Sequence, residues 1–223
     1  MMFDKISSDY DFLNHFLSLG MDKCWRRKAI KILKKYKPRK ILDIASGTGD
    51  FAFEALKLKP EKIIGIDISE KMINIAKNKA KNKDDNNLIT FLVGDSENIL
   101  YDDNSFDAII VGFGVRNFEN LNKGLSEINR VLKPGGVALI LEFTTPDTFI
   151  IRQLYYFYFN FILPFIGKYF SKHNFAYTYL PETVKLFPSG SKFINIFEKS
   201  GFSGVNQVKL TFGITSIYTG FKM

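Results

Sequence analysis

Residues 41–50 read Ile-Leu-Asp-Ile-Ala-Ser-Gly-Thr-Gly-Asp, and this stretch decides the fold of the chain. An apolar run ends in the carboxylate of Asp43, a loop of small residues follows, and a helical pattern then begins. This order is typical of the first strand, turn and helix of a nucleotide-binding α/β unit. Gly47 and Gly49 lack a Cβ atom, so they permit a tight turn and let a ligand approach the backbone. The stretch therefore predicts a nucleotide site at this turn.

The position of Asp43 indicates which nucleotide binds. Gly47, Gly49 and Ala52 fit the dinucleotide pattern G-x-G-x-x-A, but that pattern is weak by itself. Asp43 stands before the loop, where its carboxylate can accept hydrogen bonds from an ammonium group such as that of S-adenosylmethionine (SAM). A pyrophosphate would be repelled there. The loop therefore favours SAM over NAD, and a glycine-rich turn without a ligand stays a third interpretation.

Two further acids follow the next predicted strands. Asp67 lies in the apolar run 63–68, about 20 residues after the loop, where a carboxylate can hold both hydroxyls of a ribose. Asp95 follows the run 89–93 and can accept from an adenine amino group, while the backbone of Ser96 can meet a ring nitrogen. A helix cap or turn role is the alternative for Asp95. Acids at three successive strand ends are far more specific than any one of them.

Strands that alternate with helices predict an α/β domain, in which helices cover both faces of a parallel sheet. The chain closes differently, because residues 205–222 alternate in short runs broken at Gly213 and predict a hairpin. Five parallel strands finished by an antiparallel hairpin form the Rossmann-like sheet of class I SAM methyltransferases, whereas a dehydrogenase would continue with another βαβ half. The predicted parallel strands are residues 40–44, 63–68, 89–93, 106–111 and 137–143, and the main predicted helices are residues 25–36, 50–58, 70–83 and 121–132.

Length and composition fit a single enzyme-sized domain over residues 1–223, with a hydrophobic fraction of 46% that suffices for a full core. The single cysteine, Cys24, excludes an internal disulfide, and with only two histidines we expect no metal site. The opening Met-Met-Phe-Asp lacks the basic-then-apolar order of a signal peptide, so we expect a cytoplasmic protein.

The net charge of +8 is concentrated in residues 23–40 and suits nucleic acid or an acidic membrane surface. A solvated basic helix face is the alternative.

Two segments depart from the α/β pattern. Residues 1–37 predict an N-terminal helical cap, and residues 147–195 predict an aromatic lid insertion. The aromatic run 151–165 is shorter than the ~18 apolar residues of a membrane-spanning helix and is interrupted by Pro164. It predicts a lid helix, an interfacial helix at the inner face of the membrane, or a part of the core.

The chain also carries segments that are more specific than the glycine loop. They are Phe-Asp-Lys-Ile (3–6), Tyr-Asp-Phe-Leu-Asn (10–14), Leu-Ser-Leu-Gly-Met-Asp (17–22) with Trp25-Arg26, Phe-Gly-Val-Arg-Asn (113–117), and Tyr-Thr-Tyr-Leu-Pro-Glu-Thr (177–183) with Phe187-Pro188. Together they resemble the menaquinone/ubiquinone biosynthesis C-methyltransferases over essentially the whole chain.

This resemblance implies methyl transfer from SAM to a ring carbon of a prenylated quinol. Demethylmenaquinol is the first expectation, and a methoxybenzoquinol of ubiquinone synthesis is the alternative. The resemblance also implies cofactor contacts at Thr48, Asp67, Asp95 and Ser96. Some relatives have Ser where this chain has Gly112, so a hydroxyl contact to SAM is absent at that position. The full predicted cofactor set is Asp43, Gly47, Thr48, Gly49, Asp67, Asp95 and Ser96.

The predicted catalytic residues, Arg116 and Asn117, lie just past the fourth strand, where the methyl group should emerge. Deprotonation of a quinol hydroxyl makes the adjacent ring carbon nucleophilic. Arg116 stays protonated, so we assign it to stabilising the phenolate, directly or through an ordered water, and Asn117 to orienting the hydroxyl. A structural ion pair is the alternative for Arg116. Tyr10 and Tyr177 are weaker candidates for lining the quinol ring.

Two rival functions fit parts of the sequence. An RNA methyltransferase would suit the basic charge, but the segment after the fourth strand reads Gly-Phe-Gly rather than Asn/Asp-Pro-Pro-aromatic, and Cys24 is far from it. We therefore expect no nucleic-acid partner. A non-catalytic SAM-binding protein that docks on membranes would keep the three acids without needing Arg116. The oligomeric state stays open, with a homodimer among the options.

Overall fold

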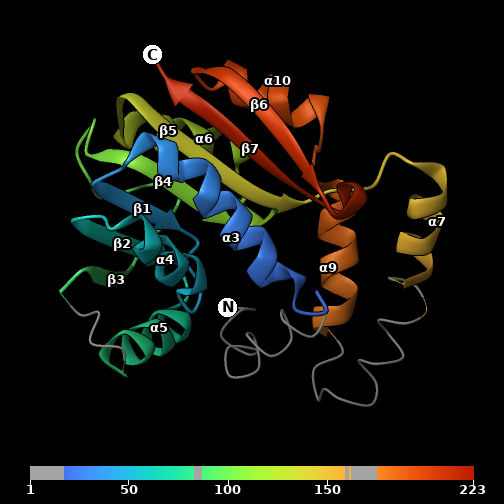
Figure 1. Ribbon diagram of the computed structural model, residues 1–223, viewed down its shortest axis with the longest axis horizontal. Coiled ribbons are helices and arrows are strands. Elements are labelled where there is room, and N and C mark those ends of the chain that lie inside the picture. The colour runs from blue at the N-terminus through green and yellow to red at the C-terminus, as the bar shows by residue number, and fades with distance from the viewer. Residues whose placement is uncertain (1–17, 83–86, 159–160, 162–174) are drawn as a thin grey trace.

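The computed structural model describes residues 18–82, 87–158, 161 and 175–223, with only the backbone for residues 175–180 (Figure 1). A sheet of seven strands in the order β3-β2-β1-β4-β5-β7-β6 forms its centre. The strands are β1 (Lys40–Ile44), β2 (Lys62–Asp67), β3 (Ile89–Val93), β4 (Phe106–Gly112), β5 (Leu132–Phe143), β6 (Phe202–Leu210) and β7 (Thr215–Lys222).

The strand directions confirm the predicted arrangement. Strands β1 to β5 pair in parallel, β7 runs antiparallel to β5, and β6 runs antiparallel to β7. The strand order reverses between β1 and β4, and a crevice forms at such a point beyond the carboxyl ends of the strands. This places the acids predicted from the sequence at one edge of the sheet.

Helices cover both faces of the sheet, as expected from the βα alternation (Figure 1). The α-helices are α3 (Met21–Leu33), α4 (Asp50–Ala55), α5 (Glu70–Asn82), α6 (Leu121–Val131), α7 (Phe149–Phe157), α9 (Phe175–Leu186) and α10 (Ser191–Lys199). Short 3₁₀ turns are η1 (Lys34–Tyr36), η2 (Leu56–Leu58), η3 (Val115–Asn117) and η5 (Thr211–Gly213). Helices α3, α4 and α5 pack on one face, and α6 and α10 pack on the other.

The alternation of side chains along each strand produces two core layers. Ile41 of β1 packs with Leu33 of α3 in one layer, whereas its neighbour Leu42 packs with Ile128 of α6 in the other. All four side chains are fully buried, and each such burial contributes about 1.5–3 kcal/mol relative to exposure. The two layers hold the strand ends in fixed positions, so the loops that follow them have a rigid base.

Two boundaries differ from the sequence-based expectation. Helix α3 begins at Met21, four residues before the predicted start, because Gly20 takes a left-handed conformation with φ 74° and lets the chain turn into the helix. Residues 133–136 were expected to form a turn before the fifth strand, but β5 already begins at Leu132. The ladder with β4 joins Leu132 to Phe106 and Val137 to Ala108, and Gly135 between them has φ 74°. The expected turn at residues 133–136 is therefore present, but it lies inside the bounds of β5.

Helices α7 and α9 lie at one end of the sheet, beside the η5 turn between β6 and β7 (Figure 1). Tyr155 of α7 is buried, whereas Phe149, Leu154 and Phe157 of the same helix are exposed. Among the described residues, no helix is long and apolar enough to cross a membrane. Of the predicted cap over residues 1–37, residues 1–17 lie outside the described residues and the rest contains α3 and η1; the boundaries of the cap and of the lid remain predictions.

Candidate active site

A cavity of about 240 Å³ opens at the carboxyl ends of β1, β2 and β4, where the strand order reverses. Ala45 and Gly47 after β1, Asp67 at the end of β2, and Phe113 after β4 contribute to its lining. A smaller polar cavity of about 40 Å³ shares the first two of these residues and Phe113, and extends toward α3. The two cavities therefore form adjoining compartments around the glycine loop.

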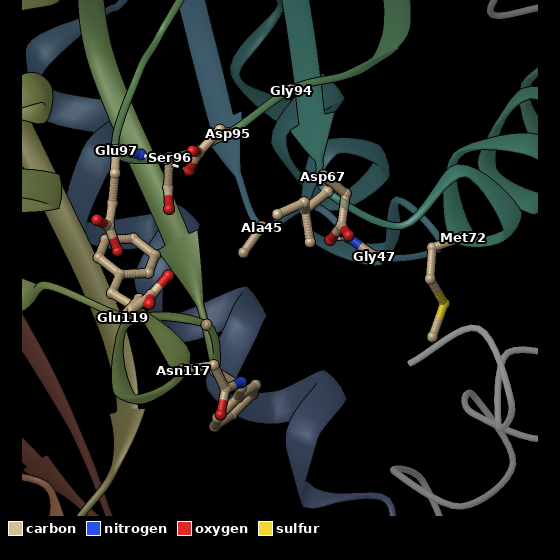
Figure 2. A pocket seen from close by; sticks show the side chains of 14 residues that line it. Ala45, Gly47, Asp67, Met72, Gly94, Asp95, Ser96, Glu97, Asn117 and Glu119 are labelled. Carbon is tan, nitrogen blue, oxygen red and sulfur yellow. Dashed lines mark hydrogen bonds between the residues drawn. The ribbon is translucent and has the colours of Figure 1, made fainter. Parts of the chain in front are cut away.

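Asp67 holds the glycine loop against β2. Its Oδ2 accepts a hydrogen bond from the amide of Gly47 at 2.8 Å (Figure 2), and its Oδ1 accepts from the amide of Ser69 at 2.9 Å. Ser69 in turn caps α5, because its hydroxyl accepts from the amide of Met72. Each carboxylate oxygen has two lone pairs, so Asp67 retains acceptor capacity toward a ligand in the larger cavity.

Asp95 and Ser96 also line the larger cavity, as predicted. The Oδ1 atom of Asp95 accepts a hydrogen bond from the amide of Glu97 at 2.8 Å. The turn role that was the alternative for Asp95 is therefore present in the structure. The two roles are compatible, because the carboxylate has a second oxygen.

The lining of the larger cavity is acidic. Figure 2 shows Asp67 and Asp95 beside Glu97 and Glu119, all around the same space. Four carboxylates repel the two phosphates of a dinucleotide and favour a cationic nucleoside. This geometry argues against NAD, because it adds four carboxylates to the repulsion that the sequence predicts from Asp43 alone.

Asp43 lies at the end of β1 and lines the smaller cavity. It is fully buried, and neither carboxylate oxygen has a hydrogen-bond partner among the described residues. The neighbouring Ser46 hydroxyl is also buried without such a partner. Buried polar groups are nearly always satisfied, so this pair indicates a missing ligand. An ammonium group fits the carboxylate.

Arg26 of α3 lines the same small cavity and was not predicted as a site residue. Its guanidinium pairs with Asp22 and donates to Asp50 Oδ2 at 3.1 Å. Lys79 donates to Thr48 Oγ1 at 2.9 Å, so the predicted contact residue Thr48 already accepts one hydrogen bond. The basic run that contains Arg26 was assigned to surface charge as a whole. The helical periodicity of this segment was the signal that could have placed Arg26 on the inward face of α3, unlike the basic residues on its outward face.

Arg116 forms the buried ion pair that was its alternative role. Its Nη1 donates to Glu142 Oε1 of β5 at 2.6 Å and to the carbonyl oxygen of Phe113 at 2.5 Å. The side chains of Arg116 and Glu142 are 8% and 0% exposed. The Nε atom of Arg116 is buried with no hydrogen-bond partner in the described part of the chain. Glu142 was missed, although a lone acid in the apolar run Leu-Ile-Leu-Glu-Phe was a visible signal.

The remaining predicted residues are placed as follows. Asn117 follows Arg116 in η3 and lines the larger cavity, whereas Arg116 is not among its described lining residues. Tyr10 lies outside the described residues. Tyr177 lies in α9, of which only the backbone is described at that position, and α9 packs against η3. The structure thus brings the downstream segment of the chain beside the predicted catalytic residues.

Comparison with known proteins identifies the family. The model of the ubiE/COQ5 methyltransferase family matches residues 1–222. The chain belongs to this family. A demethylmenaquinone methyltransferase of Bacteroides fragilis is 51% identical over 99% of this chain and 91% of its own length. A ubiquinone/menaquinone biosynthesis C-methyltransferase, UbiE, of Geotalea daltonii is 44% identical over 99% of this chain and 94% of its own.

The solved structures agree at the level of the fold. A SAM-dependent methyltransferase of Aquifex aeolicus superposes with a TM-score of 0.64 at 21% identity, covering 87% of this chain and 89% of that chain. Membership of the ubiE/COQ5 methyltransferase family and this likeness confirm the predicted fold and enzyme class. They imply SAM as the methyl donor, and the unsatisfied Asp43 beside an acidic cavity fits that molecule.

One departure within the family has a structural counterpart. Gly112 at the end of β4 is the position at which the resemblance implies Ser in some relatives. A Cβ atom at Gly112 would lie 2.8 Å from the ring of Phe51, and Phe51 and Gly112 both line the small cavity. The Phe51 ring therefore occupies the space beside β4 that a larger side chain would need.

Gly49 supports the loop of this ubiE/COQ5 methyltransferase in two ways. It has φ 89°, and a Cβ atom there would lie 2.5 Å from the ring of Phe91. We expect Gly49→Ala to lower the free energy of unfolding by about 1–3 kcal/mol, because both the backbone conformation and the packing are strained. Denaturant unfolding checks this. Gly135→Ala is a matched control, since its Cβ would meet nothing within 4 Å at a similar φ of 74°; equal losses would show that Phe91 plays no part.

Burial raises the pKa of Asp43 well above its usual range. The Ala52 amide, which lies near the carboxylate but outside hydrogen-bond geometry, opposes this shift, Asp67 adds to it and Arg26 opposes it. Folded Asp43 therefore keeps a proton that the unfolded chain releases, so its contribution to stability falls as pH rises from the usual aspartate pKa to the raised one. Asp43→Asn is neutral at every pH. We expect the mutant and the wild type to melt together at acid pH, and the mutant to melt progressively higher as pH rises through this window, without ligand. A difference in melting temperature that does not change with pH would contradict the assignment.

Proposed function

We propose that this chain transfers the methyl group of SAM to a ring carbon of demethylmenaquinol. The observation that carries the proposal is the unsatisfied, fully buried Asp43, adjoining an acidic cavity at the strand ends. The identity of the quinol is inferred from relatives whose names contain it. Other relatives are named ubiquinone/menaquinone biosynthesis C-methyltransferases. The benzoquinol of ubiquinone synthesis is therefore the alternative substrate.

Five of the predicted residues suit the parts of SAM. In this proposal Asp43 accepts from the ammonium group, Asp67 holds the ribose diol, and Asp95 and the Ser96 backbone meet the adenine. Gly47, with φ 54°, keeps the loop backbone close to the ligand. When bound, SAM supplies an electrophilic methyl group. Thr48 and Gly49 complete the loop. Arg26 is the cation among the described lining residues of the small cavity, where it would meet the carboxylate of the ligand.

The acceptor carbon becomes nucleophilic when a quinol hydroxyl loses its proton. We assign Arg116 to stabilising the resulting oxyanion, and a preorganised donor of this kind typically contributes about 10²–10³ in rate. Glu142 holds the guanidinium in place, and the unpaired Nε of Arg116 is an available donor. Since Arg116 stays protonated, the proton of the hydroxyl passes to water. After the methyl group has moved from sulfur to carbon, the ring carbon loses its hydrogen as a proton and the oxygen is protonated again, so one proton is released overall. Asn117 orients the hydroxyl from the cavity side.

Contact with a membrane surface belongs to the same proposal, because a prenylated quinol resides in lipid. The exposed apolar residues Phe149, Ile150, Leu154 and Phe157 of α7 support it. Sedimentation with vesicles of acidic phospholipid checks this contact, and a protein that stays in the supernatant at low salt would remove it.

The purified protein with isotope-labelled SAM tests the proposal. We expect label on a ring carbon of demethylmenaquinol, located by mass spectrometry, and slower transfer to a demethylated methoxybenzoquinol. Absence of label on either quinol, or label on an oxygen, would overturn the proposal. Label on added RNA would replace it with the rival function.

A further inference from the structure

An apolar cavity, larger than the two cavities of the active site, lies next to them behind the rings of Phe113 and Phe143. It has a volume of about 380 Å³ and is formed by the start of α3, the end of β5, α7 and the η5 turn. Trp25, Phe143, Ile151, Leu154 and Ile214 are among its lining residues, and no described lining residue is charged. An uncharged and largely apolar ligand would fit it.

Aromatic contacts connect this cavity to the cofactor cavities. Phe113 lines both compartments of the active site, and its ring lies 4.6 Å from that of Phe143, which lines the apolar cavity. The Trp25 ring packs against both, at 6.0 and 5.9 Å. The Arg116 guanidinium lies 5.5 Å from the centre of the Phe143 ring. A molecule whose polar aromatic head is near Arg116 would therefore have an apolar space for its substituent beside the Phe143 ring, separated from the cofactor cavities by one layer of aromatic side chains.

The η5 turn, which closes one side of the cavity, contains two residues in energetically unfavourable backbone conformations. Thr211 and Phe212 both have left-handed φ angles, 44° and 56°, which only the surrounding structure can maintain. Trp25 Nε1 donates to Thr211 Oγ1 at 2.7 Å, and Thr144 Oγ1 donates to the carbonyl oxygen of Gly213 at 2.6 Å. Strained backbone of this kind is concentrated at ligand sites.

The rim of the cavity is apolar and exposed. Phe212 is 77% exposed, and Leu154 and Leu19 also line the cavity while remaining largely exposed. Exposed apolar groups around an apolar cavity mark a binding surface rather than a solvated one. They would also let a long chain continue out of the cavity toward lipid.

We propose that this apolar cavity binds the isoprenoid tail of the substrate, starting next to the quinol ring. The identification of the chain as an isoprenoid rests on the proposed function, whereas binding of an uncharged apolar chain does not. Each buried methylene group strengthens binding, so affinity rises with the number of isoprene units until the cavity is filled.

Trp25 is the only tryptophan in the sequence and lines this cavity, so its fluorescence reports occupancy directly. We expect farnesol, with three isoprene units, to change the Trp25 emission saturably and to bind at least about tenfold more tightly than isopentenol, with one. Leu154→Arg places a charge at the mouth and should weaken farnesol binding at least about tenfold. Leu154 is 60% exposed, so the variant should fold. The matched control is Leu100→Arg, at a leucine that is 82% exposed and lines neither cavity.

Two results would overturn the tail site: no response of Trp25 to farnesol, or equal farnesol affinity in Leu154→Arg and Leu100→Arg. A second measurement compares kcat/KM for a tailed and a tail-less demethylnaphthoquinol. Their ratio should fall about tenfold in Leu154→Arg and stay constant in Leu100→Arg. If the wild type methylates no quinol, the proposed function fails by itself, and the farnesol titration still decides whether the cavity binds isoprenoids.

Discussion

Arg116→Ala is expected to lower turnover of demethylmenaquinol by about a hundredfold, while calorimetry shows SAM binding within about threefold of wild type. The reason is that Arg116 stabilises negative charge that develops on the quinol oxygen, and it does not line the described surface of the cofactor cavity. The same substitution leaves Glu142 buried without its partner. Breaking a buried pair in this way typically costs about 3–5 kcal/mol, so a loss of stability is expected as well.

A double variant separates catalysis from stability. Glu142→Gln removes the stranded charge, so Arg116→Ala with Glu142→Gln should regain most of the lost free energy of unfolding. Turnover should not recover, because the cation is still missing. If turnover returned together with stability, Arg116 would be a structural ion pair only, and the chemistry would have to be assigned to other residues.

Asp43→Asn is expected to show the opposite combination, a more stable free protein with weaker cofactor binding. The wild-type carboxylate is buried with no hydrogen-bond partner among the described residues, so its removal relieves an unfavourable burial at neutral pH. A hydrogen bond to a charged group is worth about 1.5–3 kcal/mol, so SAM affinity should fall by about 10–100-fold.

Calorimetric titration with SAM, together with thermal unfolding at the same pH, checks the Asp43 prediction. Asp107→Asn is a useful control, because Asp107 lies in the neighbouring strand β4 and its carboxylate accepts from the amides of Arg39 and Lys40. That change should lower stability without altering SAM affinity. Unchanged SAM affinity in Asp43→Asn would remove Asp43 from the cofactor site.

Local patterns in the sequence were sufficient for most of the sheet. The predicted bounds of β1 and β3 match the structure, because each is a mainly apolar run that ends at or shortly before a glycine, Gly47 after β1 and Gly94 after β3. The acids Asp43 and Asp67 meet around the glycine loop because parallel strands end at one edge of a sheet. This part of the site follows from strand direction alone.

Contacts between residues far apart in the chain could not be predicted from the sequence. The partner of Arg116 is Glu142, 26 residues away on another strand, and no local pattern specifies that contact. Pro134 and two glycines correctly indicated a turn, whereas the start of β5 at Leu132, before this turn, was not predicted. The apolar cavity needs residues from four separate elements, so it becomes visible only in the folded chain.

A crystal structure with S-adenosylhomocysteine, the product of methyl transfer, tests the central claim most directly. The claim is that the two adjoining cavities hold one nucleoside, with its amino-acid end at Asp43 and its sulfur directed toward Phe113 and Arg116. We expect the amino group within hydrogen-bond distance of the Asp43 carboxylate and the ribose hydroxyls at Asp67. Adenine in the small cavity, or sulfur directed away from Phe113, would contradict the account.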